Sequence, residues 1–508
     1  MDLWLGRGTF FFLLVFVAAA PDSIAVTQIA YSGALLCWVL RWWVCGRTPR
    51  AHPLALPLLF FLILSGVSAS QSFAPIPSWA HMKSVALLLI CVLWAENTKS
   101  VRQLKLYSTL LIAASLITVI FTAWQYSIGI GVRLSKTLSP AEVSPISPET
   151  AMASLGLENG DCISSLDGHW IRDPAKLADA IEALPTETLI PLTILRGQPL
   201  QRIRRESERS QLVGLLKELR NGKVRPSRGR PLRAQGFYDH YVTYADVLVQ
   251  IGLLVWGLFA VCPQQRMKLK TLLGLVVVAL ACALWLTLTR AAMASFLAGC
   301  LLVVFIASRW RIRWAVVGLV IVAVVAGGFL LRQGRGLTWV DLQSPEAQYR
   351  LLMWKDGLRL IREHPLWGVG MDSIMVRWRE WNIEAYEIFP LHSHFHSTPL
   401  QIAVERGLLT LLAWLWLLAE YIRVLFRLSK ATIGEHWYSR GLKLGLLGAA
   451  FGFLLGSLVD YNWGDSEVIM VFWMFVGWAV ALDSLLPAAS CSSEATHVPP
   501  HVAAGAGE

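Results

Sequence analysis

The sequence predicts an all-α polytopic membrane protein with about twelve transmembrane helices and a small α+β insertion. Of its 508 residues, 55% are hydrophobic and only 16% are charged, so the chain is more apolar than a soluble domain of this length needs to be. Apolar runs of roughly 17–25 residues, the length that crosses a bilayer as a helix, recur along the chain. Two long polar stretches, about 130–240 and 333–399, interrupt them.

Each apolar run is interpreted as one membrane-spanning helix. The N-terminal part, 1–130, holds helices 1–5; residues 241–332 hold helices 6–9; residues 400–487 hold helices 10–12; and residues 488–508 are predicted to form a disordered cytoplasmic tail. The predicted spans lie near residues 8–20, 24–44, 53–68, 79–95, 105–128, 241–262, 268–288, 291–307, 312–331, 400–427, 439–461 and 466–487.

The positive charges predict the orientation of these spans. Short loops rich in Lys and Arg stay in the cytoplasm, and five such loops fall on the same side. Both termini are then cytoplasmic, and the two long loops face outward. The net charge of +11 favours anionic lipid or phosphate partners. The five basic loops are 41–50, 99–105, 266–270, 309–313 and 427–443.

The first outer loop contains a segment of soluble composition, 139–205, with prolines, acids and short alternating apolar runs. Its run Gly156-Leu-Glu-Asn-Gly-Asp161, followed by a predicted strand ending in Asp167-Gly168, resembles the bacterial PDZ pattern. Residues 173–181 are then predicted to form the second PDZ helix and 189–196 a closing strand. PDZ domains bind extended peptides along a sheet edge. The resemblance implies a peptide or protein partner, and the alternative is a structural or docking module.

A strongly basic segment, 206–240, follows this insert. Leu212, Leu215, Leu216 and Leu219 recur in it at helical spacing. An apolar stripe under arginines predicts an amphipathic helix that lies on a membrane surface. The alternative is a basic rim that meets a phosphorylated acceptor.

Two arginines stand at predicted outer ends of spans. Arg233 opens the segment that leads into the span at 241–262, and Arg290 lies in a turn between two spans that is too short to be a solvated loop. For Arg290, a place on the outer side between two spans runs against the positive-inside tendency, and the alternative to a functional role is anchoring at the membrane interface. Arginine binds phosphate bidentately and keeps its charge, so both are candidate phosphate ligands.

The second outer loop is predicted to contain a helix. Ser344 is a good N-cap, Pro345 suits the first helical position, and the helix should stop at His364-Pro365. Arg350, Trp354 and Gly357 share one face of it. A tight turn at 367–370 follows.

Three histidines, His392, His394 and His396, stand at alternate positions just before the apolar run that begins at residue 400. In an extended segment they would share one face, which also invites a metal site. No acidic or cysteine ligand stands beside them in the sequence, so no metal is expected. The other alternative is that they cap the start of a helix at the membrane interface.

Together these pieces resemble the O-antigen ligase and polymerase superfamily of membrane glycosyltransferases. The resemblance depends on Thr289-Arg290-Ala-Ala, on Arg350 with Trp354 and Glu363-His-Pro-Leu-Trp-Gly-Val-Gly370, and on His394-Phe-His396 followed by Glu405-Arg-Gly-Leu408. The sequence departs from the family pattern at Ser397, where the family usually has Asn, at Pro399, and in having the PDZ-like insert.

The resemblance implies a GT-C-like fold in a bacterial inner membrane. It implies transfer of a glycan from undecaprenyl diphosphate to an acceptor hydroxyl, such as a lipid A-core sugar, at the periplasmic face, without cofactor, metal or nucleic acid. His396 is then the candidate general base, with His394 orienting it. Arg233 and Arg290 would stabilise the diphosphate, and Arg350 with Trp354 would bind acceptor or diphosphate.

Other functions share these features. A repeat-unit polymerase for O-antigen or exopolysaccharide uses the same donor and motifs, and a protein O-oligosaccharyltransferase would make use of a peptide-binding insert. A solute or bicarbonate transporter would need ionisable groups near the middle of its spans, whereas here they cluster at the predicted outer boundary.

Overall fold

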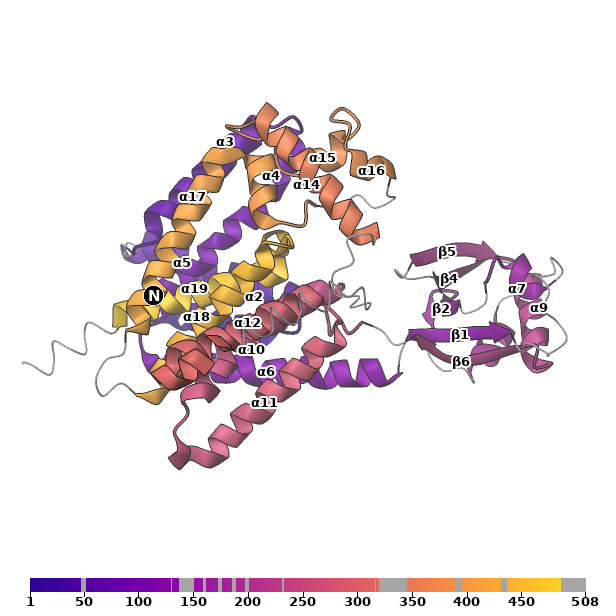
Figure 1. Ribbon diagram of the computed structural model, residues 1–508, viewed down its shortest axis with the longest axis horizontal. Helices are drawn as coiled ribbons and strands as arrows, with labels where there is room; N and C mark the ends of the chain where they lie inside the picture. Colours follow the sequence, from indigo (N-terminus) through magenta and orange to yellow (C-terminus); the bar gives the residue numbers. More distant parts are fainter. Residues whose placement is uncertain are drawn as a thin grey trace, which may run out of the picture. The chain divides into compact units, whose positions relative to one another are not determined.

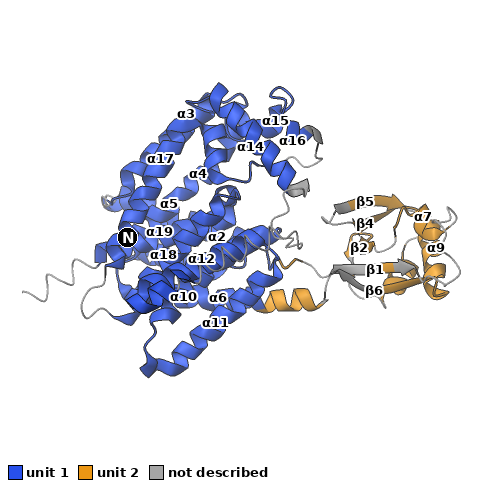
Figure 2. Ribbon diagram, in the orientation of Figure 1, with its two compact units in different colours: residues 1–119, 235–508 blue, residues 120–234 orange. Residues whose placement is uncertain are grey.

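The computed structural model describes the chain except at a set of internal gaps and the C-terminal end. The chain forms two compact units, residues 1–119 with 235–508 (unit 1) and residues 120–234 (unit 2) (Figure 2). The described residues are 1–46, 52–128, 130–136, 150–158, 161–171, 176–184, 189–196, 201–230, 233–315, 317–318, 345–388, 394–430 and 436–485.

Unit 1 is helical (Figure 1). Its N-terminal helices are α1 (Asp2–Ala19), α2 (Ile24–Cys45), α3 (Ala55–Ser70), α4 (Pro75–Val85), η1 (Ala86–Leu88), α5 (Leu89–Asn97) and α6 (Val101–Ile128), which runs on into unit 2. Its later helices are α10 (Tyr241–Val261), η2 (Gln264–Arg266), α11 (Met267–Leu286), α12 (Arg290–Ala307), α14 (Pro345–Glu363), α15 (Ser373–Arg377), α16 (Glu384–Ile388), α17 (Thr398–Ser429), α18 (Trp437–Ser457), η3 (Asn462–Gly464) and α19 (Ser466–Leu485).

The helix positions agree with the apolar runs of the sequence. Among the described residues, nine helices are long and apolar enough to cross a membrane, and the 16-residue α3 is a shorter apolar helix. The predicted span at 439–461 corresponds to α18, whereas most of the predicted span at 312–331, and the tail at 488–508, lie outside the described residues. The helix predicted after Ser344 is confirmed as α14, which ends just before His364.

The core of unit 1 forms around its two most buried candidate spans, α10 and α19. The backbones of α10 and α18 cross closely at two glycines, since a Cβ on Gly257 would lie 2.2 Å from the backbone nitrogen of Gly445. Small residues permit such close crossings between membrane helices. Trp94, Tyr107 and Trp478 pack as an aromatic cluster, with the rings of Trp94 and Tyr107 4.9 Å apart.

The described residues of unit 2 form an antiparallel sheet with short helices. Its strands run in the order β5-β4-β2-β1-β6, with β3 paired to β2. The first and last strands of the unit are neighbours, because Ile130 pairs with Arg230. The elements are β1 (Ile130–Lys136), α7 (Ala151–Ser154), β2 (Cys162–Leu166), β3 (His169–Trp170), α8 (Lys176–Glu182), β4 (Ile190–Arg196), β5 (Gln201–Ser207), α9 (Arg209–Arg220) and β6 (Val224–Arg230).

The basic segment expected on a membrane surface belongs to this unit. Its leucine stripe forms α9 as the spacing predicts, but Leu212 and Leu215 are fully buried in the core of unit 2. A helix whose apolar face is already covered by its own domain has no such face left for a lipid surface. The inserted unit therefore extends beyond 139–205 on both sides, from β1 to β6.

Candidate active site

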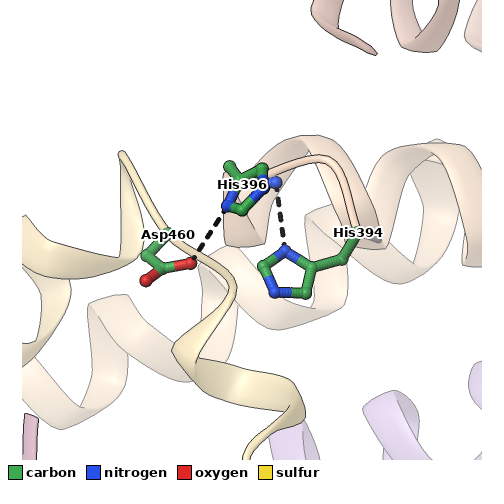
Figure 3. A group of neighbouring side chains, drawn as sticks. All are labelled: His394, His396 and Asp460. Atoms are coloured by element: carbon green, nitrogen blue, oxygen red, sulfur yellow. Dashed lines mark hydrogen bonds and ion pairs between the residues drawn. The ribbon is translucent and has the colours of Figure 1, made fainter. Parts of the chain in front are cut away.

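His394, His396 and Asp460 form a compact group at the N-terminal end of α17 (Figure 3). The Nδ1 atom of His396 lies 3.5 Å from Oδ1 of Asp460. The backbone N–H of His396 donates to Nδ1 of His394 at 3.3 Å, and the two imidazole rings are 4.4 Å apart between centroids. Two imidazoles and a carboxylate, from segments far apart in sequence, thus share one site.

Backbone contacts fix this group in place. The Thr398 N–H at the start of α17 donates to the carbonyl of Asp460 at 3.2 Å, and the Phe395 N–H donates to Oε1 of Gln401 at 2.8 Å. His396 itself has φ of +49°, a left-handed conformation that non-glycine residues adopt at some cost and that is found at functional sites. The expectation of one extended segment is therefore wrong at His396, where the chain turns.

The helix α14 packs directly against the group. Nε1–H of Trp354 donates to the carbonyl of Phe395 at 2.9 Å, and Nη1 of Arg350 donates to the carbonyl of Val459 at 3.1 Å. The ring of Tyr349 meets that of His396 edge-on at 5.9 Å. One face of α14 thus brings an arginine to the segment that carries Asp460 and a tryptophan to the segment that carries the histidines.

Burial and charge set the protonation states of the group. Burial above all, followed by the electrostatic effect of the neighbouring His396, lowers the pKa of His394 to about 4. His394 is therefore neutral near pH 7, and because its Nδ1 accepts a hydrogen bond, its proton lies on Nε2. Burial alone would raise the pKa of Asp460, but its contact with His396 and the nearness of both imidazoles hold that pKa below its usual value. Asp460 is thus a carboxylate facing an imidazole.

His396 lacks a well-formed partner for its buried Nδ1 atom among the described residues. At 3.5 Å, Asp460 is within ion-pair range but at the outer limit for a hydrogen bond. Catalytic hydrogen bonds in ligand-free enzymes are often long and shorten when substrate binds. The arrangement fits a histidine whose partner engages fully during the reaction.

A cavity of about 270 Å³ adjoins His394, and residues of α4 and α17 contribute to its lining. Nδ1 of His81 lies 2.9 Å from Oδ2 of Asp372, and the N–H of Asp372 donates to Oε1 of Glu405 at 2.9 Å. The residues that line the cavity are His81, Asp372, Ile374, Met375, Tyr386, His394, Phe395, Gln401, Glu405, Tyr461, Gly464 and Asp465.

A kink in α17 places Glu405 at this cavity. Gly407 has φ of +79° and breaks the helical geometry, and a Cβ there would lie 2.0 Å from the carbonyl oxygen of Leu366. The run 363–370 docks on this kink, because the N–H of Gly370 donates to the carbonyl of Glu405 at 2.8 Å and that of Leu408 to the carbonyl of Pro365 at 2.8 Å. The two motifs that the sequence shows separately are therefore one structural unit.

Four of the six residues predicted for the site come together in the structure. Arg290 is the exposed first residue of α12 in unit 1, and Arg233 is an exposed residue of unit 2. His392 lies outside the described residues. The four that come together are His394, His396, Arg350 and Trp354.

Sequence reasoning missed Asp460, His81 and Asp372, and quoted Glu405 without a role. Asp460 begins a short polar run between two apolar segments, 460–467, and a carboxylate at that boundary was the available signal. His81 sits inside a predicted span, where an ionisable residue deserves a functional hypothesis.

The same group has the donor set of a metal site. His394, His396 and Asp460 each offer one ligand atom, and these atoms lie within 4.8 Å of one another. Two imidazoles and a carboxylate suit divalent transition metals. The sequence argument against a metal depended on the absence of a neighbouring acid, and Asp460 removes that argument.

Comparison with known proteins gives two similarities. Residues 275–415 match a family model described as O-Antigen ligase, a segment that includes Arg290, α14 and both histidines but neither His81 nor Asp460. A protein of Rickettsia conorii (strain ATCC VR-613 / Malish 7) with the provisional name polysaccharide ligase is 26% identical over 153 residues, which cover 28% of this chain and 33% of that protein.

The chain therefore spans only a third of the length of the curated relative that it matches. Nine apolar helices among the described residues and the ligase family model together indicate a membrane protein. Over the matched segment, the chain is therefore similar to an O-antigen ligase family model and to a protein named as a polysaccharide ligase.

Proposed function

We propose that the protein is a glycosyltransferase that moves a glycan from undecaprenyl diphosphate to an acceptor hydroxyl on a lipid A-core sugar. The observation that carries this proposal is the placement of His396 between a carboxylate, Asp460, and the arginine-bearing helix α14. This transfer needs a base and a permanent cation side by side. The segment 275–415, which carries His396 and α14, is similar to an O-antigen ligase family model.

His396 acts as the general base. The acceptor hydroxyl gives its proton to Nε2 of His396, the ring nitrogen that does not face Asp460, while the hydroxyl oxygen attacks the anomeric carbon. The bond between sugar and diphosphate breaks at the same time, and its electron pair leaves on the diphosphate. Asp460 faces Nδ1 of His396, which orients the ring and stabilises the imidazolium that forms. His394 stays neutral and holds the backbone of His396.

The arginines stabilise the departing diphosphate. Guanidinium groups bind phosphate oxygens bidentately and need no metal to do so. Arg350 is the member of this set beside the histidines, and Arg290 and Arg233 are proposed to complete it when substrate is bound. Trp354 positions the Phe395 carbonyl and thereby the turn that bears His396.

The setting of the reaction follows from the charges of the loops. We propose a bacterial inner membrane, with both termini in the cytoplasm and the catalytic loop and unit 2 in the periplasm. Unit 2 is proposed to be PDZ-like and to take an extended peptide at a sheet edge, a mode that its antiparallel strands support. Because β1 pairs with β6, deletion of 130–230 rather than 139–205 is the clean test of that role.

The first experiment is transfer from a purified undecaprenyl diphosphate glycan to lipid A-core by the full-length protein, compared with Arg290→Ala and His396→Ala. Product linked to the core, lost in both variants, supports the ligase and both roles. Normal transfer by either variant removes that residue from the mechanism.

Two further outcomes decide against a core ligase. Elongated lipid-linked chains without core attachment identify a polymerase, and no consumption of donor leaves transport as the better hypothesis. His436→Ala is the matched control, because Nδ1 of His436 accepts the N–H two residues later, as that of His394 does, but at the start of α18. It tests whether loss of a capping imidazole is enough to stop transfer.

A further inference from the structure

The cavity beside the histidines has a lining that selects its ligand by charge. Three of its lining residues are carboxylates, Asp372, Glu405 and Asp465, and its described lining contains no lysine or arginine. A diphosphate would meet negative charge on several sides here, which costs free energy in a partly buried site. The donor's diphosphate is therefore excluded from this cavity.

One of these carboxylates has unused hydrogen-bonding capacity. Glu405 is 2% exposed, its Oε1 accepts the N–H of Asp372, and its Oε2 has no hydrogen-bond partner among the described residues. The adjacent Arg406, also 2% exposed, provides a counter-charge that offsets part of the cost of burying the carboxylate. A buried polar atom without a partner is destabilising, and a ligand that donates a hydrogen bond to Oε2 would remove that destabilisation.

The remaining walls are aromatic and apolar. Tyr386, Phe395 and Tyr461 line the cavity with Ile374 and Met375. Its volume is about 270 Å³, slightly smaller than pockets that hold drug-sized ligands, which measure about 300–1,000 Å³. Carboxylates for hydroxyl donors, flat rings for the C–H face of a sugar and room for a single ring together describe a monosaccharide site.

We propose that this cavity binds the terminal sugar of the acceptor, and that it takes a hydroxyl-rich ring that is neutral or carries an amino group. It rejects a ring that carries a carboxylate or phosphate. That the bound sugar is the acceptor rests on the proposed transfer reaction. That the cavity binds a sugar does not. His394 belongs to both the cavity and the catalytic group, so a ring bound here lies next to the base.

Sugar binding by the full-length protein in nanodiscs tests the site without any transfer step. The probes are methyl glucoside, glucosamine and glucuronate, followed by saturation-transfer NMR. We expect the first two to bind at least tenfold more tightly than glucuronate. Glu405→Gln keeps the acceptor for the Asp372 N–H, removes the charge and should narrow this difference to less than threefold. Equal binding of all three sugars to the unaltered protein overturns the proposal.

Transfer kinetics supply the second measurement. We expect Glu405→Gln and Asp372→Asn to raise the KM for the acceptor about tenfold while the KM for the donor changes less than twofold. Glu420→Gln is the matched control, the same substitution on the same helix but at a residue that pairs with Arg423 outside the cavity. An unchanged acceptor KM, or a raised donor KM, contradicts the assignment.

The two proposals fail separately. Sugar binding that depends on Glu405 in a protein that transfers nothing to any acceptor leaves the site standing and overturns the transfer reaction. Confirmed transfer, with sugar binding that does not depend on Glu405, supports the transfer reaction and overturns the sugar site. If Glu405→Gln does not reach the membrane folded, Asp372→Asn carries both measurements.

Discussion

Two histidine–aspartate pairs in unit 1 differ in how completely they are formed. His81 and Asp372 are joined at 2.9 Å, whereas His396 and Asp460 are 3.5 Å apart and leave a buried ring nitrogen without a good hydrogen bond. Each pair contains one residue with positive φ, Asp372 in the first and His396 in the second. A satisfied pair holds structure, and an unsatisfied one can change its protonation state during a reaction.

The largest expected effect separates the two histidines. His396→Gln removes the base and should lower kcat by about 10²–10⁴-fold, the usual contribution of general base catalysis. His81→Gln should lower kcat less than tenfold and act mainly on the KM for the acceptor. Steady-state transfer by both variants at equal membrane levels checks this. Similar losses of kcat in both would show that the two pairs do not differ in role.

Substitution of Asp460 should also lower kcat, but by less than substitution of His396. Asp460→Asn should lower kcat by about 10–100-fold with little change in either KM, because the imidazolium loses its counter-charge. Asp460→Glu should recover part of the rate. A change in KM alone, or no recovery by Glu, would mean that Asp460 merely supports the fold of the 459–462 segment.

A smaller effect concerns stability in acid. Because the pKa of His394 is lowered to about 4 in the folded protein and is about 6.5 in an unfolded chain, the unfolded state binds more protons between these values. Stability should then fall as pH drops from about 6.5 to about 4. His394→Gln should flatten that part of the curve of unfolding temperature against pH. An unchanged slope would contradict the neutral assignment.

Removal of metal ions should have no effect on the transfer rate. The proposed mechanism needs no metal, so prolonged treatment with EDTA should leave the transfer rate within twofold. Elemental analysis of protein purified without added metal provides the control. One tightly held zinc per chain, with activity lost on its removal, would instead assign the group of His394, His396 and Asp460 as a metal centre.

The sequence predicts local features of this molecule well and distant contacts poorly. Apolar runs locate the helices, and a cap followed by proline correctly marks the start of α14. Asp460 escapes prediction because it meets His396 across 64 residues of sequence, and Asp372 meets His81 across 291. No periodicity encodes such contacts, which arise only when the helices pack.

The inserted unit shows a second kind of limit. The leucine stripe of α9 has the spacing of any amphipathic helix, and the pattern does not say whether lipid or a protein core covers it. The edge strand β6, Val-Arg-Pro-Ser-Arg-Gly-Arg, shows no apolar alternation, so nothing marks it as part of a sheet until β1 is placed beside it.

The pairing of Ile130 with Arg230 has an evolutionary consequence. The first and last strands of unit 2 lie side by side, so the whole unit occupies the position of a simple hairpin in the chain between α6 and α10. A genetic event could add, remove or exchange it as a cassette without respacing the helices on either side. The inserted unit and the helical unit could then diverge independently across related proteins.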